Sequence, residues 1–169
     1  TMATTTGGRN VALSPDGKFA LAGTAGHILT QWDVATGALT KTLTAKLPPR
    51  APVGECYGIA ISPDGKFALS ASNDRTVRYW DLTSGTCLHT LKTAGYGRPF
   101  SAVCFTADGL RGIAGCSDNN IYIWDLKTGK LLHTLKGHTA RVLGLTVSKN
   151  GKYLLSGSWD NSIKLWQLP

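Results

Sequence analysis

The sequence has few acidic residues and few charged residues of either sign. Asp and Glu number 10 against 18 Lys and Arg, and charged residues make up 17% of the 169 positions, where roughly 25% is usual for a globular domain. No stretch approaches the ~20 consecutive apolar residues of a transmembrane helix, and no basic segment leads into an apolar run at the start. The sequence therefore predicts neither a membrane span nor a secretory signal.

The four cysteines lack the spacing of a metal or redox site. Cys56, Cys87, Cys104 and Cys116 include no pair separated by two residues, which is the spacing of zinc and thioredoxin-type sites. We expect them to be small buried or strand residues in a reducing compartment. The pattern therefore predicts no metal, no cofactor and a cytoplasmic location.

Motifs that carry catalysis are also missing. The sequence has no phosphate-binding glycine loop followed by Lys and Ser or Thr, no Gly-x-Ser-x-Gly elbow and no paired carboxylates outside its turns. We therefore expect no enzymatic activity. What is abundant is glycine, with 20 residues, beside 42% apolar residues. This composition favours a folded chain of many short strands and tight turns over long helices.

A unit with a fixed internal spacing occurs four times. Each copy has a tight-turn tetrapeptide and, 18 residues after its first position, a tryptophan. The turns begin at Ser14, Ser62, Thr106 and Ser148, and the tryptophans are Trp32, Trp80, Trp124 and Trp166. Segments of alternating apolar and polar residues surround these positions and are bounded by Gly, Pro, Asn and Asp, which is the pattern of strands and hairpins. Each unit is therefore predicted to be a four-stranded antiparallel meander.

The repeat resembles the WD-repeat family of β-propellers. An aspartate follows each of the first three tryptophans, and the last unit contains Gly137-His138, Ser156-Gly157-Ser158-Trp159-Asp160 and Lys164-Leu165-Trp166. Successive tryptophans are 42 to 48 residues apart, close to the ~40–45 of that family. The resemblance implies an all-β fold, a β-propeller of four-stranded antiparallel blades. We expect one propeller segment over residues 1–169 with four blades at about 8–44, 55–92, 100–136 and 138–169, the last lacking its own outer strand.

The resemblance also implies a buried hydrogen-bond network that joins a histidine, a hydroxyl, an aspartate and the repeat tryptophan. Such a network is structural, because buried polar groups must satisfy one another, so the Ser, His and Asp of the last blade are not interpreted as a catalytic triad. The expected members are His138, Ser156, Asp160 and Trp166 in the last blade, Ser70, Asp74 and Trp80 in the second, and Asp118 and Trp124 in the third. Other residues stand at the missing positions, namely Pro52 for the second-blade histidine, Tyr96 and Ala114 in the third blade, and Ala22 and Gly26 in the first.

A propeller closes into a ring because each blade needs a neighbour on both faces. Four blades are half of an eight-bladed ring, and closed symmetry is usual for homo-oligomers. We therefore expect a homodimer of two half-rings, with residues 1–6 of one chain near the open edge of the other chain's last blade. The alternatives are a piece of a longer propeller chain and a self-closed ring of four blades.

Loops on the rims of a propeller carry its function, because the blades themselves are packing. Two connections, 44–55 and 93–100, are longer than the minimum, and the resemblance places both on the upper face. It also places Trp159 there, and tryptophan and arginine are the residues most often found at binding hot spots. The residues that we expect to contact a protein or peptide partner are Trp159, Arg141, Tyr96, Arg98 and Asn73.

The sequence thus favours a non-enzymatic scaffold that binds a protein or peptide, and two other functions stay open. The net charge of +8 suggests nucleic-acid or polyanion binding as one alternative. The basic residues are scattered, however, and form no stripe of the kind that nucleic-acid surfaces show. The other alternative is a half-propeller, engineered or evolutionary, whose only activity is self-assembly.

Overall fold

The computed structural model describes residues 10–25, 28–46, 54–94 and 97–169, and every regular element in these ranges is a β-strand. Fifteen strands form four antiparallel sheets in which neighbours along the chain pair with each other. We call these sheets blades 1 to 4 in chain order. The expected all-β fold with four blades is confirmed. Within the described residues no helix is long and apolar enough to cross a membrane.

The strands follow the predicted meander in every blade. Blade 1 contains β1 (Asn10–Leu13), β2 (Phe19–Gly23), β3 (Ile28–Asp33) and β4 (Leu39–Thr44). Blade 2 contains β5 (Cys56–Ile61), β6 (Phe67–Ser72), β7 (Val77–Asp81) and β8 (Thr86–Leu91). Blade 3 contains β9 (Phe100–Phe105), β10 (Arg111–Cys116), β11 (Ile121–Asp125) and β12 (Leu131–Leu135). Blade 4 has three strands, β13 (Val142–Val147), β14 (Tyr153–Ser158) and β15 (Ile163–Gln167).

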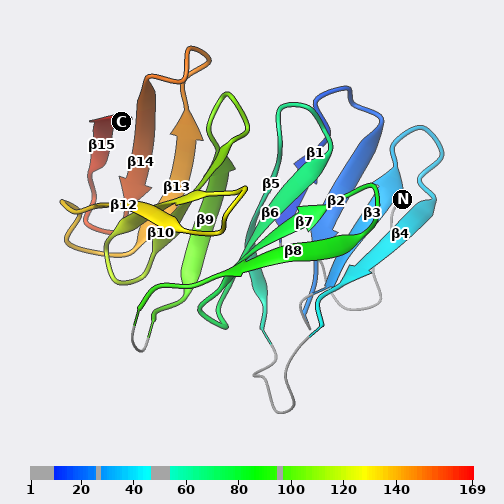
Figure 1. The fold of residues 1–169 in the computed structure, drawn as a ribbon, viewed down its shortest axis with the longest axis horizontal. Helices are drawn as coiled ribbons and strands as arrows, with labels where there is room; N and C mark the ends of the chain where they lie inside the picture. The colour runs from blue at the N-terminus through cyan, green and yellow to red at the C-terminus, as the bar shows by residue number, and fades with distance from the viewer. Residues whose placement is uncertain (1–9, 26–27, 47–53, 95–96) are drawn as a thin grey trace.

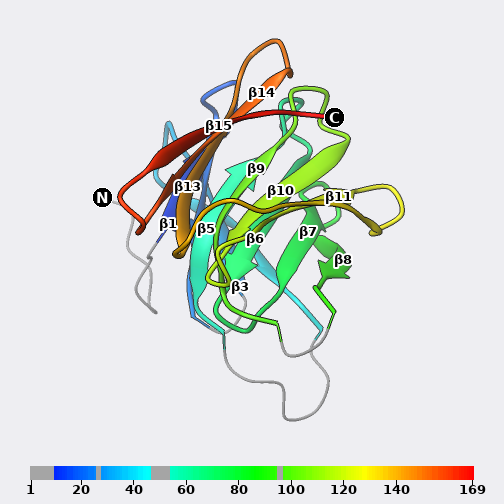
Figure 2. The ribbon, with the colours of Figure 1, turned by 90° about the vertical axis from the view of Figure 1, so that its left-hand side faces the viewer.

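The blades stand face to face in an open arc, with blade 1 at one end and blade 4 at the other (Figures 1 and 2). The innermost strands β1, β5, β9 and β13 lie next to one another along the inside of the arc. We call the rim that carries the blade-to-blade connections and the β2–β3, β6–β7, β10–β11 and β14–β15 turns the upper rim. It lies at the bottom of Figure 1. The opposite, lower rim carries the tight turns.

Side-chain hydrogen bonds fix each tight turn on the lower rim. In the first turn the Ser14 hydroxyl donates to Asp16 Oδ1 at 2.7 Å, and the Phe19 amide donates back to the Ser14 Oγ at 3.0 Å. Gly17 has a φ of 71°, a left-handed conformation that glycine adopts without a Cβ clash. The same arrangement recurs at Ser62, Thr106 and Ser148. The repeat thus sets the register of β1–β2 and of its three equivalents.

The hydrophobic core lies between blades. One cluster joins blades 1 and 2 around Leu21 and Trp80, a second joins blades 2 and 3 around Leu69 and Trp124, and a third joins blades 3 and 4 around Ile113. Trp80 and Trp124 have exposed fractions of 0% and 1%. Trp80 and Trp124 therefore help to hold their blades to a neighbour, and Trp166 packs against the third cluster in the same way.

The two ends of the arc expose positions that are buried at the internal junctions. On blade 4, Leu155 is 41% exposed and Ile163 is 72% exposed. The residues at the Leu155 position of blades 1 to 3, which are Leu21, Leu69 and Ile113, are all 0% exposed. A self-closed ring of four blades would cover these faces, so the described residues do not form one.

Blade 1 exposes the complementary half of a blade junction. Val11 and Leu13 on β1 are 75% and 61% exposed. Their equivalents on β5, Ile59 and Ile61, pack against the core shared with blade 1. The two ends of the arc therefore expose the two sides of one blade junction. We call the blade 1 side the inserting half and the blade 4 side the receiving half.

The four cysteines are unpaired thiols. Cys56 and Cys116 are buried, and Cys87 and Cys104 are half-buried. Burial raises the pKa of the Cys104 and Cys116 thiols to about 12, and a thiol in that state is a poor nucleophile and metal ligand.

Candidate interaction face and the networks that support it

A chain of hydrogen bonds crosses blade 4 from its tryptophan to its aspartate. Trp166 Nε1 donates to Ser156 Oγ at 2.7 Å, Ser156 Oγ lies 2.7 Å from His138 Nε2, and His138 Nδ1 lies 2.7 Å from Asp160 Oδ2. In the tautomer whose Nδ1–H donates to the carboxylate, Nε2 accepts from the serine hydroxyl. Ser156 is 1% exposed, so its hydroxyl is out of reach of a substrate. The arrangement ties the connection before β13 to the sheet.

Asp160 remains ionised because several donors converge on it. Hydrogen bonds from the Ser162 hydroxyl, the Thr139 amide and the His138 ring outweigh the effect of burial and hold the pKa of its carboxyl well below the usual 3.8. A lowered pKa means that the carboxylate contributes stability at neutral pH. That contribution is lost as the pH falls below the usual value towards the lowered one.

The variant Asp160→Asn tests this dependence. We expect the wild type to be more stable than the variant in urea unfolding at pH 7. The difference in the free energy of unfolding should narrow from about pH 4 downwards, because Asp160 is protonated in the unfolded chain while it is still ionised in the folded one. The other aspartates titrate in the wild type and in the variant alike, so their contribution cancels in the difference between the two stabilities. A difference that stays constant from pH 7 to pH 3 would contradict this role.

Blade 2 builds its network with an arginine. Trp80 Nε1 donates to Ser70 Oγ at 2.9 Å, as in blade 4. Asp74 Oδ2 accepts from Arg78 Nη2 at 2.6 Å, and the two side chains are only 5% and 4% exposed. The guanidinium supplies the donor that histidine supplies in blade 4. The Pro52 position, where the sequence comparison located the missing histidine, lies outside the described residues.

In blades 1 to 3 the position two residues before the repeat tryptophan provides a substitute hydrogen-bond partner, for the aspartate in blades 2 and 3 and for the tryptophan itself in blade 1. It is Arg78 in blade 2 and Tyr122 in blade 3, where the tyrosine hydroxyl donates to Asp118 Oδ2 at 2.5 Å. In blade 1 it is Thr30, which accepts from Trp32 Nε1 at 2.9 Å. Sequence reasoning missed all three, although their fixed offset from the tryptophan was available as a signal.

The variant Arg78→Met tests the buried pair of blade 2. We expect a loss of about 3–5 kcal/mol in the free energy of unfolding, because the change breaks the buried ion pair between Arg78 and Asp74. Adding Asp74→Asn should recover much of that loss, since the buried site then holds neither member of the ion pair. Denaturant unfolding of the single and double variants measures both. Equal stabilities of the two variants would show that the pair does not act as a unit.

Arg141 lies at the upper rim between two aromatic rings. Its guanidinium carbon is 5.1 Å from the Tyr57 ring centre and 5.5 Å from the Trp159 ring centre, and its Nε donates to Ser101 Oγ at 2.8 Å. Contacts to aromatic faces and a fixed Nε hold the side chain in one orientation. Within the described part of the chain, no carboxylate forms an ion pair with it. Its Nη groups make no hydrogen bond to the described residues.

Trp159 stands where blades 2 and 3 have a polar residue whose side chain bonds to the preceding chain. Its backbone amide donates to the Arg141 carbonyl, just as the amides of Asn73 and Ser117 donate to the chain before β5 and β9. The Asn73 and Ser117 side chains also bond to that chain, at 2.7 and 2.8 Å. An indole cannot make this bond in the same way, and Trp159 is 63% exposed. Asn73, by contrast, is engaged in holding β5.

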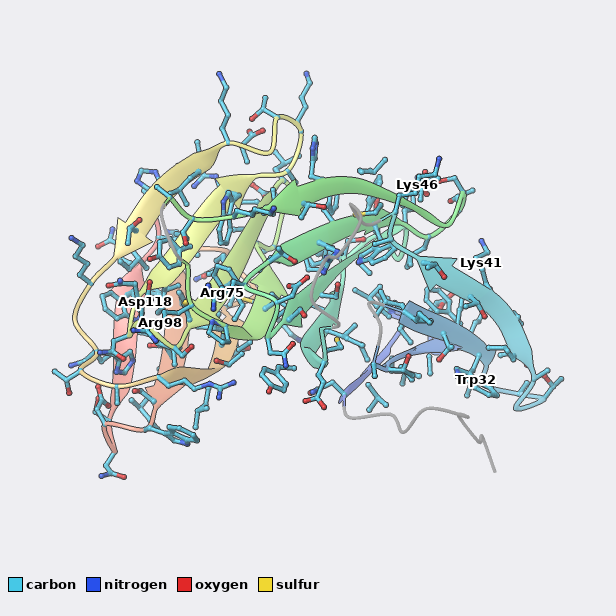
Figure 3. The ribbon with its side chains drawn as sticks, turned by 90° about the horizontal axis from the view of Figure 1, so that it is seen from below. Trp32, Lys41, Lys46, Arg75, Arg98 and Asp118 are labelled. Atoms are coloured by element: carbon cyan, nitrogen blue, oxygen red, sulfur yellow. The ribbon has the colours of Figure 1, made fainter. Side chains whose placement is uncertain are left out.

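Figure 3 looks onto the upper rim and shows Arg75, Arg98 and Asp118 on it. Arg98 is exposed, and its carbonyl accepts a bond from Cys116 Sγ at 3.4 Å. Arg75 is also exposed, with a φ of 73°. Tyr96 lies outside the described residues. The structure therefore brings together Arg141 and Trp159 among the expected contact residues, and adds Tyr57 and Ser101, which the sequence did not single out.

Metal ligation finds no support in the described ranges. No group of three or more His, Cys, Asp or Glu side chains there could hold an ion.

Comparison with known proteins identifies the repeat. The WD40 family, described as "WD domain, G-beta repeat", matches residues 39–81, 85–125 and 129–167, which is most of the chain. Each match begins at or just before the outer strand of one blade and ends with the third strand of the next. Blade 1 strands β1 to β3 lie before the first match.

Two curated proteins share short similar segments with the chain. Over 30 residues, 18% of this chain, it is 53% identical to the U4/U6 small nuclear ribonucleoprotein PRP4 of Saccharomyces cerevisiae. Over 33 residues, 20% of this chain, it is 46% identical to the small ribosomal subunit protein RACK1 of Dictyostelium discoideum. The matched segments span only 6% and 10% of those two proteins. From its family matches and its bladed fold, the chain belongs to the WD40 repeat family of β-propeller proteins.

Proposed function

We propose that the chain is a non-enzymatic interaction module that binds a protein or peptide through its upper rim, and that a second copy completes its ring. Proteins with WD repeats act as protein-interaction scaffolds, and the more specific statements are our own. The observation that carries the binding surface is Arg141, oriented by Tyr57, Trp159 and Ser101. The unpaired thiols are compatible with our further proposal of a cytoplasmic location.

The upper rim offers the two kinds of group that dominate binding energies. Trp159 presents a large exposed aromatic surface, and Arg141 presents a cation whose side-chain entropy is already reduced by its contacts. Charge complementarity favours a carboxylate on the partner, because guanidinium and carboxylate groups bond in a bidentate geometry. We therefore propose a partner segment that carries an acidic residue beside an apolar one.

Selection of displayed peptides tests this proposal. We expect peptides enriched on the 169-residue chain to carry an acidic residue, and to lose at least about tenfold in affinity when Arg141 or Trp159 is replaced by alanine. Lys152→Ala, at an exposed position in a tight turn of the lower rim, is the control and should bind as the wild type does. Enrichment of peptides that bind both alanine variants unchanged would overturn the assignment of this face.

The second copy is supported by the two exposed ends of the arc. Leu155 and Ile163 on blade 4 expose the receiving half of a blade junction, and Val11 and Leu13 on blade 1 expose the inserting half. Two arcs related by a two-fold axis would bring each receiving half against an inserting half. A ring of eight blades built in this way has no open face.

A polyanion is the second candidate for the upper rim. Arg75 and Arg98 are exposed on this rim, which also carries the half-buried Arg141. The two similar proteins are named as components of ribonucleoprotein and ribosomal particles. Binding of single-stranded RNA that weakens steeply between 50 and 200 mM salt would favour this candidate, by roughly the counterion-release relation. Absence of binding at low salt would remove it.

A further inference from the structure

A cavity opens between blades 2 and 3 on the lower rim, away from the proposed interaction face. It measures ≈ 770 Å³, compared with ≈ 340 Å³ between blades 1 and 2 and ≈ 410 Å³ between blades 3 and 4. Its walls include Tyr79, whose ring stacks on Phe67 at 5.2 Å and on His89 at 6.2 Å. Leu88 and Leu110 at its edge are 44% and 66% exposed. We call this cavity the 2/3 groove.

The junction between blades 1 and 2 shows what occupies the same position there. Lys41 extends from β4 across the junction, and its Nζ donates to the carbonyl oxygens of Leu82 at 2.6 Å and Thr83 at 2.9 Å. Its aliphatic stem passes over Gly85, close enough that a Cβ there would contact it at 3.6 Å. The chain therefore fills this junction with a lysine of its own.

The 2/3 groove lacks that lysine. Strand pairing places His89 opposite Tyr79 just as it places Lys41 opposite Gln31, so His89 stands at the Lys41 position. The carbonyls equivalent to those of Leu82 and Thr83 belong to Leu126 and Lys127, which both line the groove. Neither carbonyl accepts a hydrogen bond from any residue in the described ranges. The pair of carbonyls that holds an ammonium group at the first junction therefore has no donor among the described residues at the second.

Carboxylates add a negative potential to the same groove. Asp64, Asp108 and Asp125 line it, and each uses only Oδ1 for the hydrogen bonds of its own turn in the described structure. Hydrogen bonds from Thr106 and Thr128 hold the pKa values of Asp108 and Asp125 below the usual range. These acids therefore stay charged well below neutral pH, although the chain as a whole carries +8.

We propose that the 2/3 groove binds a lysine side chain of a partner protein. The ammonium group bonds to the carbonyl oxygens of Leu126 and Lys127, and the aliphatic stem lies along Tyr79 and Leu88. Lys41 sets the precedent for a compact ammonium at two carbonyls. The exposed Leu88 and Leu110 favour a protein segment over a free polyamine, because apolar residues beside the partner's lysine can pack on these two leucines. This site is separate from the upper rim and does not depend on that proposal.

Titration of the ¹⁵N-labelled 169-residue chain with the capped pentapeptide Gly-Leu-Lys-Leu-Gly tests the site. We expect saturable shifts of the Leu110, Leu126 and Lys127 amide resonances. The same peptide with acetylated lysine should bind at least about tenfold more weakly, because the ammonium charge is removed. Spermidine should bind more weakly than the lysine peptide. Shifts scattered over the surface, equal binding of the acetylated peptide or tighter binding of spermidine would overturn the proposal.

Two variants make the test specific to the groove. His89→Lys should place the chain's own ammonium on the two carbonyls and abolish peptide binding, whereas His133→Lys, the same change at the equivalent position of blade 3, should leave it intact. Lys41→Ala should create a second site, seen as new shifts at Leu82 and Thr83. Unchanged binding by the His89→Lys chain would contradict the proposed receptor.

Discussion

Replacing Leu155 by aspartate should prevent the proposed dimer from forming and leave the chain as a folded monomer. Leu155 is 41% exposed at the blade 4 end of the arc, where the residues at its position in the other blades are fully buried by a neighbour. In the proposed ring a second copy covers it, and a carboxylate without a partner cannot be buried there without a large desolvation cost. We expect at least about a 100-fold weaker dimer, which is a loss of roughly 2.7 kcal/mol.

Leu132→Asp is the matched control for this experiment. Leu132 on β12 is 43% exposed, nearly the same as Leu155, but it lies away from both ends of the arc. Light scattering should find Leu132→Asp at the wild-type mass and Leu155→Asp at the monomer mass, with equal far-ultraviolet circular dichroism. Equal masses for the wild type and both variants would argue against closure through this face.

Trp80→Ala should destabilise the chain far more than the same change at the exposed Trp159. The Trp80 side chain is 0% exposed at the junction of blades 1 and 2, and its Nε1 donates to Ser70. Truncation removes the buried indole and leaves a cavity, at a cost of about 3–5 kcal/mol in the free energy of unfolding. Ser70→Ala should cost about 1–3 kcal/mol, because it leaves the buried indole N–H without an acceptor.

Trp159→Ala removes the same side chain from an exposed position and serves as the control. At 63% exposure the change should alter stability by about 0.5 kcal/mol or less. Chemical denaturation followed by circular dichroism measures all three variants. If Trp159→Ala destabilised the chain as much as Trp80→Ala, the division between packing and rim tryptophans would be wrong.

The fold could be predicted because its information is local and repeated. A turn tetrapeptide and a tryptophan at a fixed offset recur four times, and each turn is closed by side chains only two to five residues apart. The expected blade ranges of 8–44, 55–92, 100–136 and 138–169 enclose the observed strands. Strand order followed because neighbours along the chain pair with each other.

The substituted networks could not be predicted from a residue-by-residue comparison. Arg78 and Tyr122 look like ordinary strand residues, and their role depends on which face of the strand they occupy. Each points towards an aspartate four residues earlier in the chain. A sequence search restricted to the histidine position finds only that the histidine is absent. The structure shows that another side chain donates to the network aspartate in its place.

The rim cluster and the groove depend on contacts between blades. Arg141 precedes blade 4, yet it packs on Tyr57 of blade 2 and bonds to Ser101 of blade 3. The 2/3 groove becomes visible only when Lys41 and His89 are compared at one register position across two junctions. Contacts between side chains of different blades depend on how the blades stand relative to one another. The repeat predicts the order of the blades but not these contacts.

The mass of the unmodified 169-residue chain in solution tests the central claim most directly. Sedimentation equilibrium at micromolar concentration should find twice the 17.9 kDa of the chain, because two arcs close one ring through their complementary ends. A single species of 17.9 kDa across the concentration range would contradict closure by a second copy.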